Sequence, residues 1–79
     1  EAGRAEEAMD HYRQGLAIAE SNDLRMQMGE LLSRLGGTAP DRQRRMEYLQ
    51  RALTVFRELG AKARMSEVQQ MVHQSIMGR

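Results

Sequence analysis

The chain has 79 residues, a net charge of +1 and no cysteine. This length fits one small domain or a piece of a longer array. The lack of cysteine excludes disulfides and thiolate metal sites, and suits a reducing, cytoplasmic environment. No apolar run approaches the roughly 20 residues of a membrane-spanning helix. The acidic opening EAGRAEEA lacks the apolar region of a secretory signal. We expect a soluble protein without a membrane partner.

The charges are divided unevenly along the chain. Residues 1–35 carry four arginines against seven acidic residues, whereas residues 36–79 carry eight basic residues against four acidic ones. The division has two interpretations. The charges solvate separate helix faces, or the two ends attract each other between copies or repeats.

The first predicted helix covers residues 4–20 and contains a repeated segment. Residues 8–20 (AMDHYRQGLAIAE) match residues 45–57 (RMEYLQRALTVFR), 37 positions later. Self-similarity at such a period is typical of stacked helical units. The helix has no good N-cap, and nothing covers one side of its broad apolar surface. We therefore expect the chain to be a fragment whose open face receives a missing helix, a second copy or a partner.

The second predicted helix covers residues 23–35. Polar residues at 21–23 can cap its start. Its apolar residues follow a regular helical spacing. Gly36-Gly37 is predicted to end it, because glycine readily adopts the left-handed conformation of helix C-termini. The stripe consists of Leu24, Met28, Leu31, Leu32 and Leu35.

The third and fourth predicted helices cover residues 40–59 and 61–77. Thr38 is the predicted cap of the third helix, followed by a proline and an acid in its first turn. Gly60 is predicted to end it. The fourth helix is placed from Ala61 because good helix formers follow, although a capping box at residues 66–69 would start it later. No strand-like alternation occurs, so the expected fold is all-α with antiparallel neighbouring helices.

The first helix resembles the second helix of a tetratricopeptide repeat. The resemblance rests on Gly3, Ala8, Tyr12 and Gly15-Leu16. Residues 45–57 resemble the same helix again, with Leu49 in place of the aromatic residue, Ala52 as the small residue and Arg45 departing from the pattern. Leu35-Gly36 resembles the Leu-Gly pair of the family's first helix, although the period of 37 differs from the usual 34. The stretch FRELGAKAR is similar to the ends of repeat arrays in large bacterial signalling proteins.

The resemblance implies a fold and a function. The fold is a four-helix α-solenoid fragment in which residues 1–79 form a single domain whose last helix acts as a cap. The function is a non-catalytic scaffold that binds a protein or peptide in the groove lined by the second and fourth helices. Candidate contact residues are the side chains beside the apolar stripes of those helices. They are Arg25, Met26, Glu30, Arg34, Arg64, Gln69, Gln70 and His73.

Other chemistry has little support in the residues. His11 and His73 lie far apart in sequence, and no acid–base pair or nucleophile with a base is evident, so we expect no metal, cofactor or catalysis. Gly36-Gly37-Thr38 lacks the lysine of a phosphate-binding loop. Arginines crowd the third helix, but the aromatic residues that stack on nucleic-acid bases are missing among them. The alternative function is self-association, in which exposed terminal helix faces pair with copies of the same chain.

Overall fold

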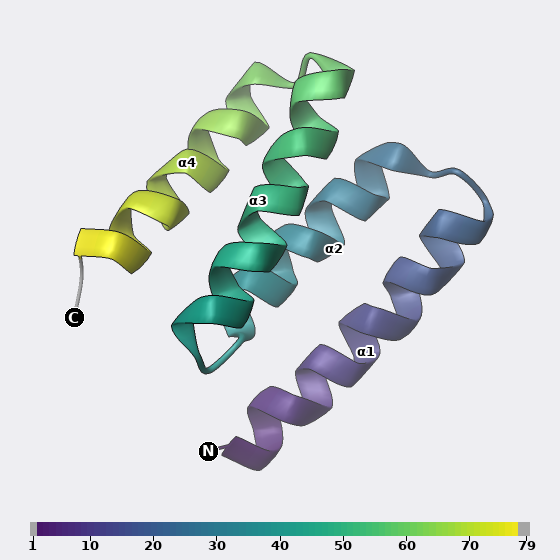
Figure 1. Cartoon of the computed structure of the whole chain (residues 1–79). Coiled ribbons are helices and arrows are strands. Elements are labelled where there is room, and N and C mark those ends of the chain that lie inside the picture. Colours follow the sequence, from purple (N-terminus) through teal and green to yellow (C-terminus); the bar gives the residue numbers. More distant parts are fainter. Residues whose placement is uncertain (1, 78–79) are drawn as a thin grey trace.

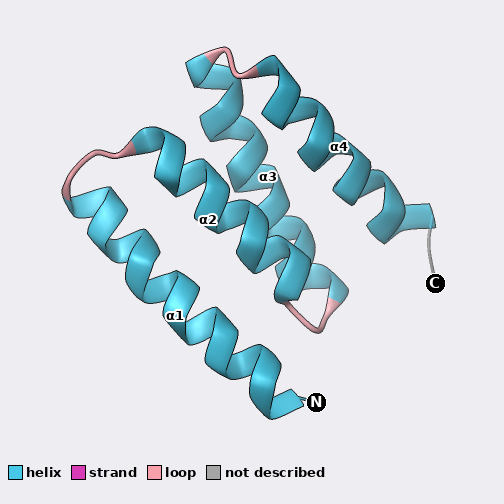
Figure 2. Ribbon diagram, turned by 180° about the vertical axis from the view of Figure 1, so that it is seen from behind, coloured by secondary structure: helices cyan, strands magenta, loops and turns pink. Residues whose placement is uncertain are grey.

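The computed structural model describes residues 2–77, which form four helices and no strand. These are α1 (Ala2–Ser21), α2 (Arg25–Thr38), α3 (Arg42–Leu59) and α4 (Lys62–Met77). Consecutive helices run antiparallel, because only short turns join them (Figures 1 and 2). The predicted all-α class is confirmed. None of the described helices has the length and apolar character to cross a membrane.

The helices pack in chain order, so that α2 lies between α1 and α3, and α3 lies between α2 and α4. A single apolar core runs through all four helices. Half-buried side chains such as Tyr12, Met28 and Met65 pack around it. The side chains that are almost fully buried are Met9, Leu32, Leu35, Leu49, Phe56 and Val68.

The prediction that Gly36-Gly37 ends the second helix is wrong, because α2 continues to Thr38. Gly36 is buried, and a methyl group there would overlap the side chain of Leu49. Gly29, seven residues earlier, meets the ring of Phe56 in the same way. Two glycines on one face therefore let α3 approach α2 closely, and Gly36 serves packing instead of ending the helix.

The helix starts also differ from the sequence prediction. Asp41 caps α3, since its Oδ1 accepts a hydrogen bond of 2.7 Å from the backbone N–H of Arg44. Thr38, the predicted cap, instead donates its hydroxyl hydrogen to the carbonyl of Arg34 within α2. Leu24 occupies the N-cap position of α2 without a side-chain hydrogen bond, so the polar residues at 21–23 do not cap it.

Two other boundaries agree with the sequence. Gly60 ends α3 in the left-handed conformation, with φ of 69°, as glycine at this position predicts. Helix α4 begins at Lys62, which favours the earlier of the two predicted starts. Its far end is held by Arg42, whose guanidinium donates hydrogen bonds of 3.0 Å to the carbonyls of Ser75 and Ile76. A cation at a helix C-terminus satisfies carbonyls that have no partner within the helix.

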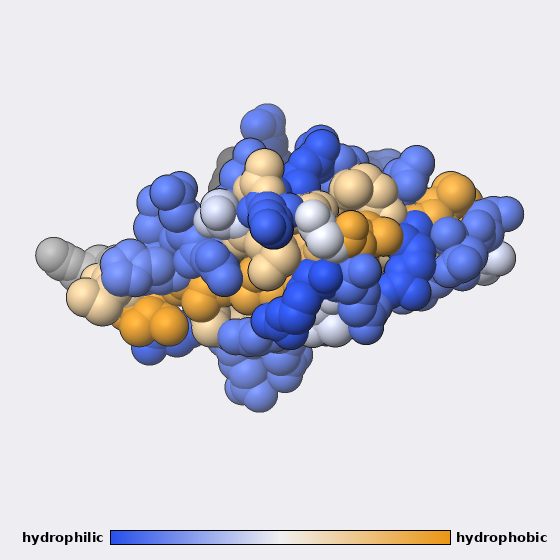
Figure 3. Space-filling model, turned by 90° about the horizontal axis from the view of Figure 1, so that it is seen from above, coloured by the Kyte–Doolittle hydropathy of each residue, from blue (hydrophilic) through white to orange (hydrophobic). Residues whose placement is uncertain are grey.

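Several large apolar side chains are exposed. Ile18 is 61% exposed on α1, and Ile76 is 55% exposed near the end of α4. In the view of Figure 3, apolar surface reaches the exterior near both narrow ends of the molecule. The core thus leaves some apolar surface uncovered on the outermost helices.

Candidate functional site

A cleft of about 390 Å³ between α2 and α4 is the candidate site. Glu30, Ser33 and Arg34 line it from α2, because residues three and four apart share one helix face. The opposite wall comes from α4, where the same spacing rule brings its lining residues to one face. The floor contains the ring of Phe56 from α3. The lining residues of α4 are Arg64, Glu67, Val68 and Met71.

A second hollow of about 350 Å³ continues the cleft towards the α2–α3 turn. The two hollows adjoin, because Met71 lines both of them. Gly37 keeps this part open: it has no side chain, and a methyl group there would lie 3.3 Å from the Met71 terminal carbon. Arg45 borders the hollow while its guanidinium donates to the carbonyl of Ala39. The result is an elongated groove with a narrow apolar floor.

The walls of the cleft carry both signs of charge. Arg64 on α4 forms an ion pair with Glu30 on α2, which joins the two walls. Arg34 and Glu67 also line the cleft, and neither forms an ion pair within residues 2–77. Both are exposed. The cleft therefore offers one cation and one anion whose charges a ligand can neutralise.

The structure brings three of the eight predicted contact residues together in the cleft. These are Glu30, Arg34 and Arg64. Arg25 lies elsewhere, because its guanidinium pairs with Glu58 of α3. Met26 is 39% exposed at the beginning of α2, outside the residues that line the cleft.

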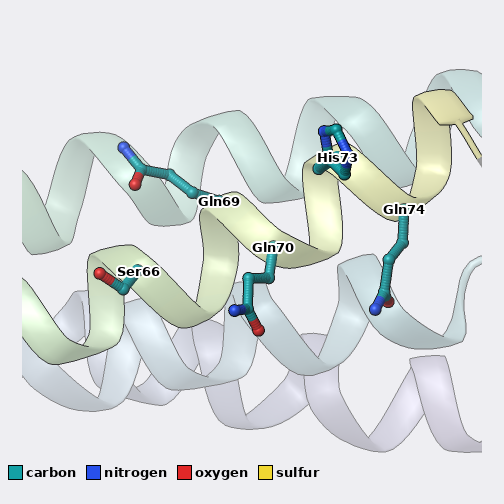
Figure 4. Close-up of a pocket in the computed structure, with 5 residues that line it drawn as sticks. All are labelled: Ser66, Gln69, Gln70, His73 and Gln74. Atoms are coloured by element: carbon teal, nitrogen blue, oxygen red, sulfur yellow. The ribbon is translucent and has the colours of Figure 1, made fainter.

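The other three predicted residues lie on a different face of α4. Gln69, Gln70 and His73 surround a shallow hollow of about 510 Å³ together with Ser66 and Gln74 (Figure 4). All five side chains come from α4 alone, and only Gln74 also lines the groove. Six of the eight predicted residues are thus divided between two surfaces, and Arg25 and Met26 lie on neither, because position beside an apolar stripe does not say on which side of the stripe a residue lies.

Five cleft-lining residues were not among the eight predicted contacts. Four of them lie three to seven positions after predicted cleft residues, so helical spacing alone could have identified them: Ser33, Glu67, Val68 and Met71. The fifth is Phe56 of α3. Its appearance on the cleft floor depends on how α3 packs beneath α2 and α4, which local spacing does not give.

Arg44, outside the cleft, is involved in two pKa shifts. The hydrogen bonds from Arg44, first from its backbone N–H and then from its side chain, lower the pKa of Asp41. Those that Arg44 donates to Asp41 and Glu6 raise the pKa of its guanidinium. Residues 2–77 contain no group of three or more metal-ligating side chains. What the cleft offers chemically is charge and apolar contact.

Comparison of the chain with known protein families, curated proteins and solved structures gives no match.

Proposed function

We propose that the chain is a tetratricopeptide-like, cytoplasmic scaffold module that binds a segment of another protein between α2 and α4. The observation that carries the proposal is the groove that joins two hollows of about 390 and 350 Å³ along these helices. Such grooves suit extended or helical peptides, which place side chains at regular intervals along them. The resemblance assigns the groove to the same two helices.

The ligand we propose carries both an acidic and a basic residue around an apolar one. Arg34 would pair with the acidic residue and Glu67 with the basic one, because neither has an ion-pair partner within residues 2–77. Met71 offers a flexible apolar contact between the hollows, and methionine adapts readily to different side chains. The Arg64–Glu30 pair stabilises the walls and contributes less to binding.

Selection from a displayed library of random peptides, followed by NMR titration with the selected peptide, tests this proposal. Residues on the groove faces of α2 and α4 should show the largest chemical-shift changes. The variant Arg34→Glu should weaken binding roughly tenfold or more, as expected when a charge-assisted contact of about 1.5–3 kcal/mol is lost. Circular dichroism should show unchanged helicity, because Arg34 is exposed.

The matched control is Arg57→Glu, which makes the same charge change at an exposed position of α3. Arg57 is not among the residues that line the groove. Equal affinities for the wild type and Arg34→Glu, or shift changes confined to α1, would contradict the proposal.

A further inference from the structure

The contact between α1 and α3 shows how repeated helices meet in this chain. Glu6 pairs with Arg44 at 3.3 Å, and Glu20 pairs with Arg51 at 3.4 Å. Glu6, Arg13 and Glu20 are spaced by seven, so they share the face of α1 that points to α3. Arg44 and Arg51 have the same spacing and mark the face of α3 that points to α1.

The residues of α3 that match this face of α1, 37 positions later, lie on the side of α3 that points away from α1. Thirty-seven positions after Met9 comes Met46. Met9 is fully buried, whereas Met46 is half-buried and borders a shallow, open hollow of about 600 Å³ on α3. We call this surface the Met46 face. It consists of Gln43, Met46, Glu47 and Gln50, with Arg51, which pairs with Glu20 of α1, at its edge towards α1.

In the same way, the residues of α1 that match the α1-facing side of α3 lie on the side of α1 that points away from α3. Thirty-seven positions before Arg44, Arg51 and Val55 lie Glu7, Gln14 and Ile18. Val55 is 8% exposed, but Ile18 is 61% exposed. We call this surface the Ile18 face, and it consists of Glu7, His11, Gln14 and Ile18, all of them exposed. The chain therefore presents, on two different helices, the positions equivalent to the two halves of its internal contact, with Gln43 in place of Glu6 and Gln14 in place of Arg51.

Helix α1 and the pair formed by α3 and α4 carry net charges of opposite sign. Helix α1 carries four acidic residues against two arginines, whereas α3 and α4 together carry seven basic residues against three acidic ones. Opposite net charges attract α1 of one copy to the α3–α4 side of another, and like ends repel.

We propose that a second copy of this chain stacks head to tail, with its Ile18 face on the Met46 face of the first. This inference goes beyond the proposed peptide groove, because the α2–α4 cleft shares no residue with either face. Each copy then binds one neighbour through its Met46 face and another through its Ile18 face. Such a heterologous contact leaves one face open at each end of the assembly unless its rotation closes a ring, so the assembly grows beyond a dimer as the concentration rises.

Light scattering after size exclusion, over a roughly hundredfold concentration range, tests the proposal. The wild-type mass should rise with concentration beyond twice the 9.0 kDa of one chain. Ile18→Glu alone and Met46→Glu alone should each stay at the mass of a monomer. Mixed in equal amounts, the two variants should form a dimer and nothing larger, because each retains one intact face.

Met26→Glu is the control, because Met26 is an exposed apolar residue of α2 outside both faces, and this variant should assemble like the wild type. Helicity is checked by circular dichroism. If Met46→Glu loses helicity, the exposed Gln50→Glu replaces it, since the added acid repels the acidic α1 of the next copy. A wild type that stays at 9.0 kDa throughout, or a Met46→Glu variant that forms a dimer on its own, would overturn the proposal.

Discussion

Helices α1 and α3 have matching sequences but different surroundings. At one matched pair, Ile18 on α1 is 61% exposed and Val55 on α3 is 8% exposed. At another pair the order is reversed, because Met9 on α1 is fully buried while Met46 on α3 is only half-buried. At a third pair, Leu16 and Leu53, the burial is nearly the same, with 6% and 7% exposed.

The comparison teaches that the repeat fixes which way a side chain points, and the neighbours decide whether it is buried. Helix α3 packs on α2 and α4, whereas the described contacts of α1 are chiefly with α2. On α1, the side that faces α3 is covered and the opposite side is open. On α3, the side that faces α1 is covered and the opposite side is open. Buried and exposed members of a matched pair therefore differ through position in the stack and not through residue type.

The largest expected effect that tests this comparison is on the two methionines. Met9→Ala should lower the free energy of unfolding by about 2–5 kcal/mol, the usual cost of removing a fully buried Met side chain. Met46→Ala, the same substitution at the matched position, should cost about 1 kcal/mol or less, because that side chain is already half in water. Urea unfolding at low protein concentration measures both values. Equal losses for the two variants would show that the repeated helices are buried alike.

A smaller effect separates two adjacent glycines of α2, the helix between the two repeated ones. Gly36→Ala should destabilise the fold by about 1–3 kcal/mol, because the added methyl group overlaps Leu49 of α3. Gly37→Ala should stabilise it by about 0.5–1 kcal/mol, since alanine favours helix and only the mobile end of Met71 lies near. The melting temperature should therefore fall for Gly36→Ala and rise for Gly37→Ala. Two shifts of the same sign would mean that α2 and α3 do not approach closely at Gly36.

The smallest expected effect concerns the N-cap of α3 at Asp41. Helix α1 has no equivalent cap, because the matched position is Arg4, which lies inside that helix. The pKa of Asp41 is lowered in the folded chain by the hydrogen bonds from Arg44. Its stabilising contribution is therefore present above the ordinary aspartate pKa of about 3.9, and is lost as the pH falls through the lower folded value. Asp41→Ala should reduce the melting temperature at neutral pH and have little effect at roughly pH 2.

Asp41→Asn is the control for that measurement, because asparagine retains a capping oxygen without a titrating carboxylate. Its melting temperature relative to Asp41→Ala should not change between the two pH values. If Asp41→Ala changes the melting temperature equally at both pH values, the ionised carboxylate does not provide the stabilisation.

The sequence predicted part of the candidate cleft. Glu30, Arg34 and Arg64 were assigned to a groove, and they line one cleft in the structure. Gln69 and His73 were assigned to the same groove but lie on another face of α4. Periodicity identifies polar positions around a helix, but the direction of each neighbouring helix is a property of the assembled fold. The role of these residues in binding remains a prediction.

The sequence by itself determined the all-α class, the number of helices, the stop at Gly60 and the 37-residue repeat. These features depend on local quantities, namely helical periodicity and the backbone freedom of glycine. Only the tertiary structure decided that α2 runs through Gly36, that Asp41 caps α3, and that Met9 is buried while Met46 is not. Each of these depends on atoms distant in sequence or on competition between nearby hydrogen-bond partners, and a local pattern records neither.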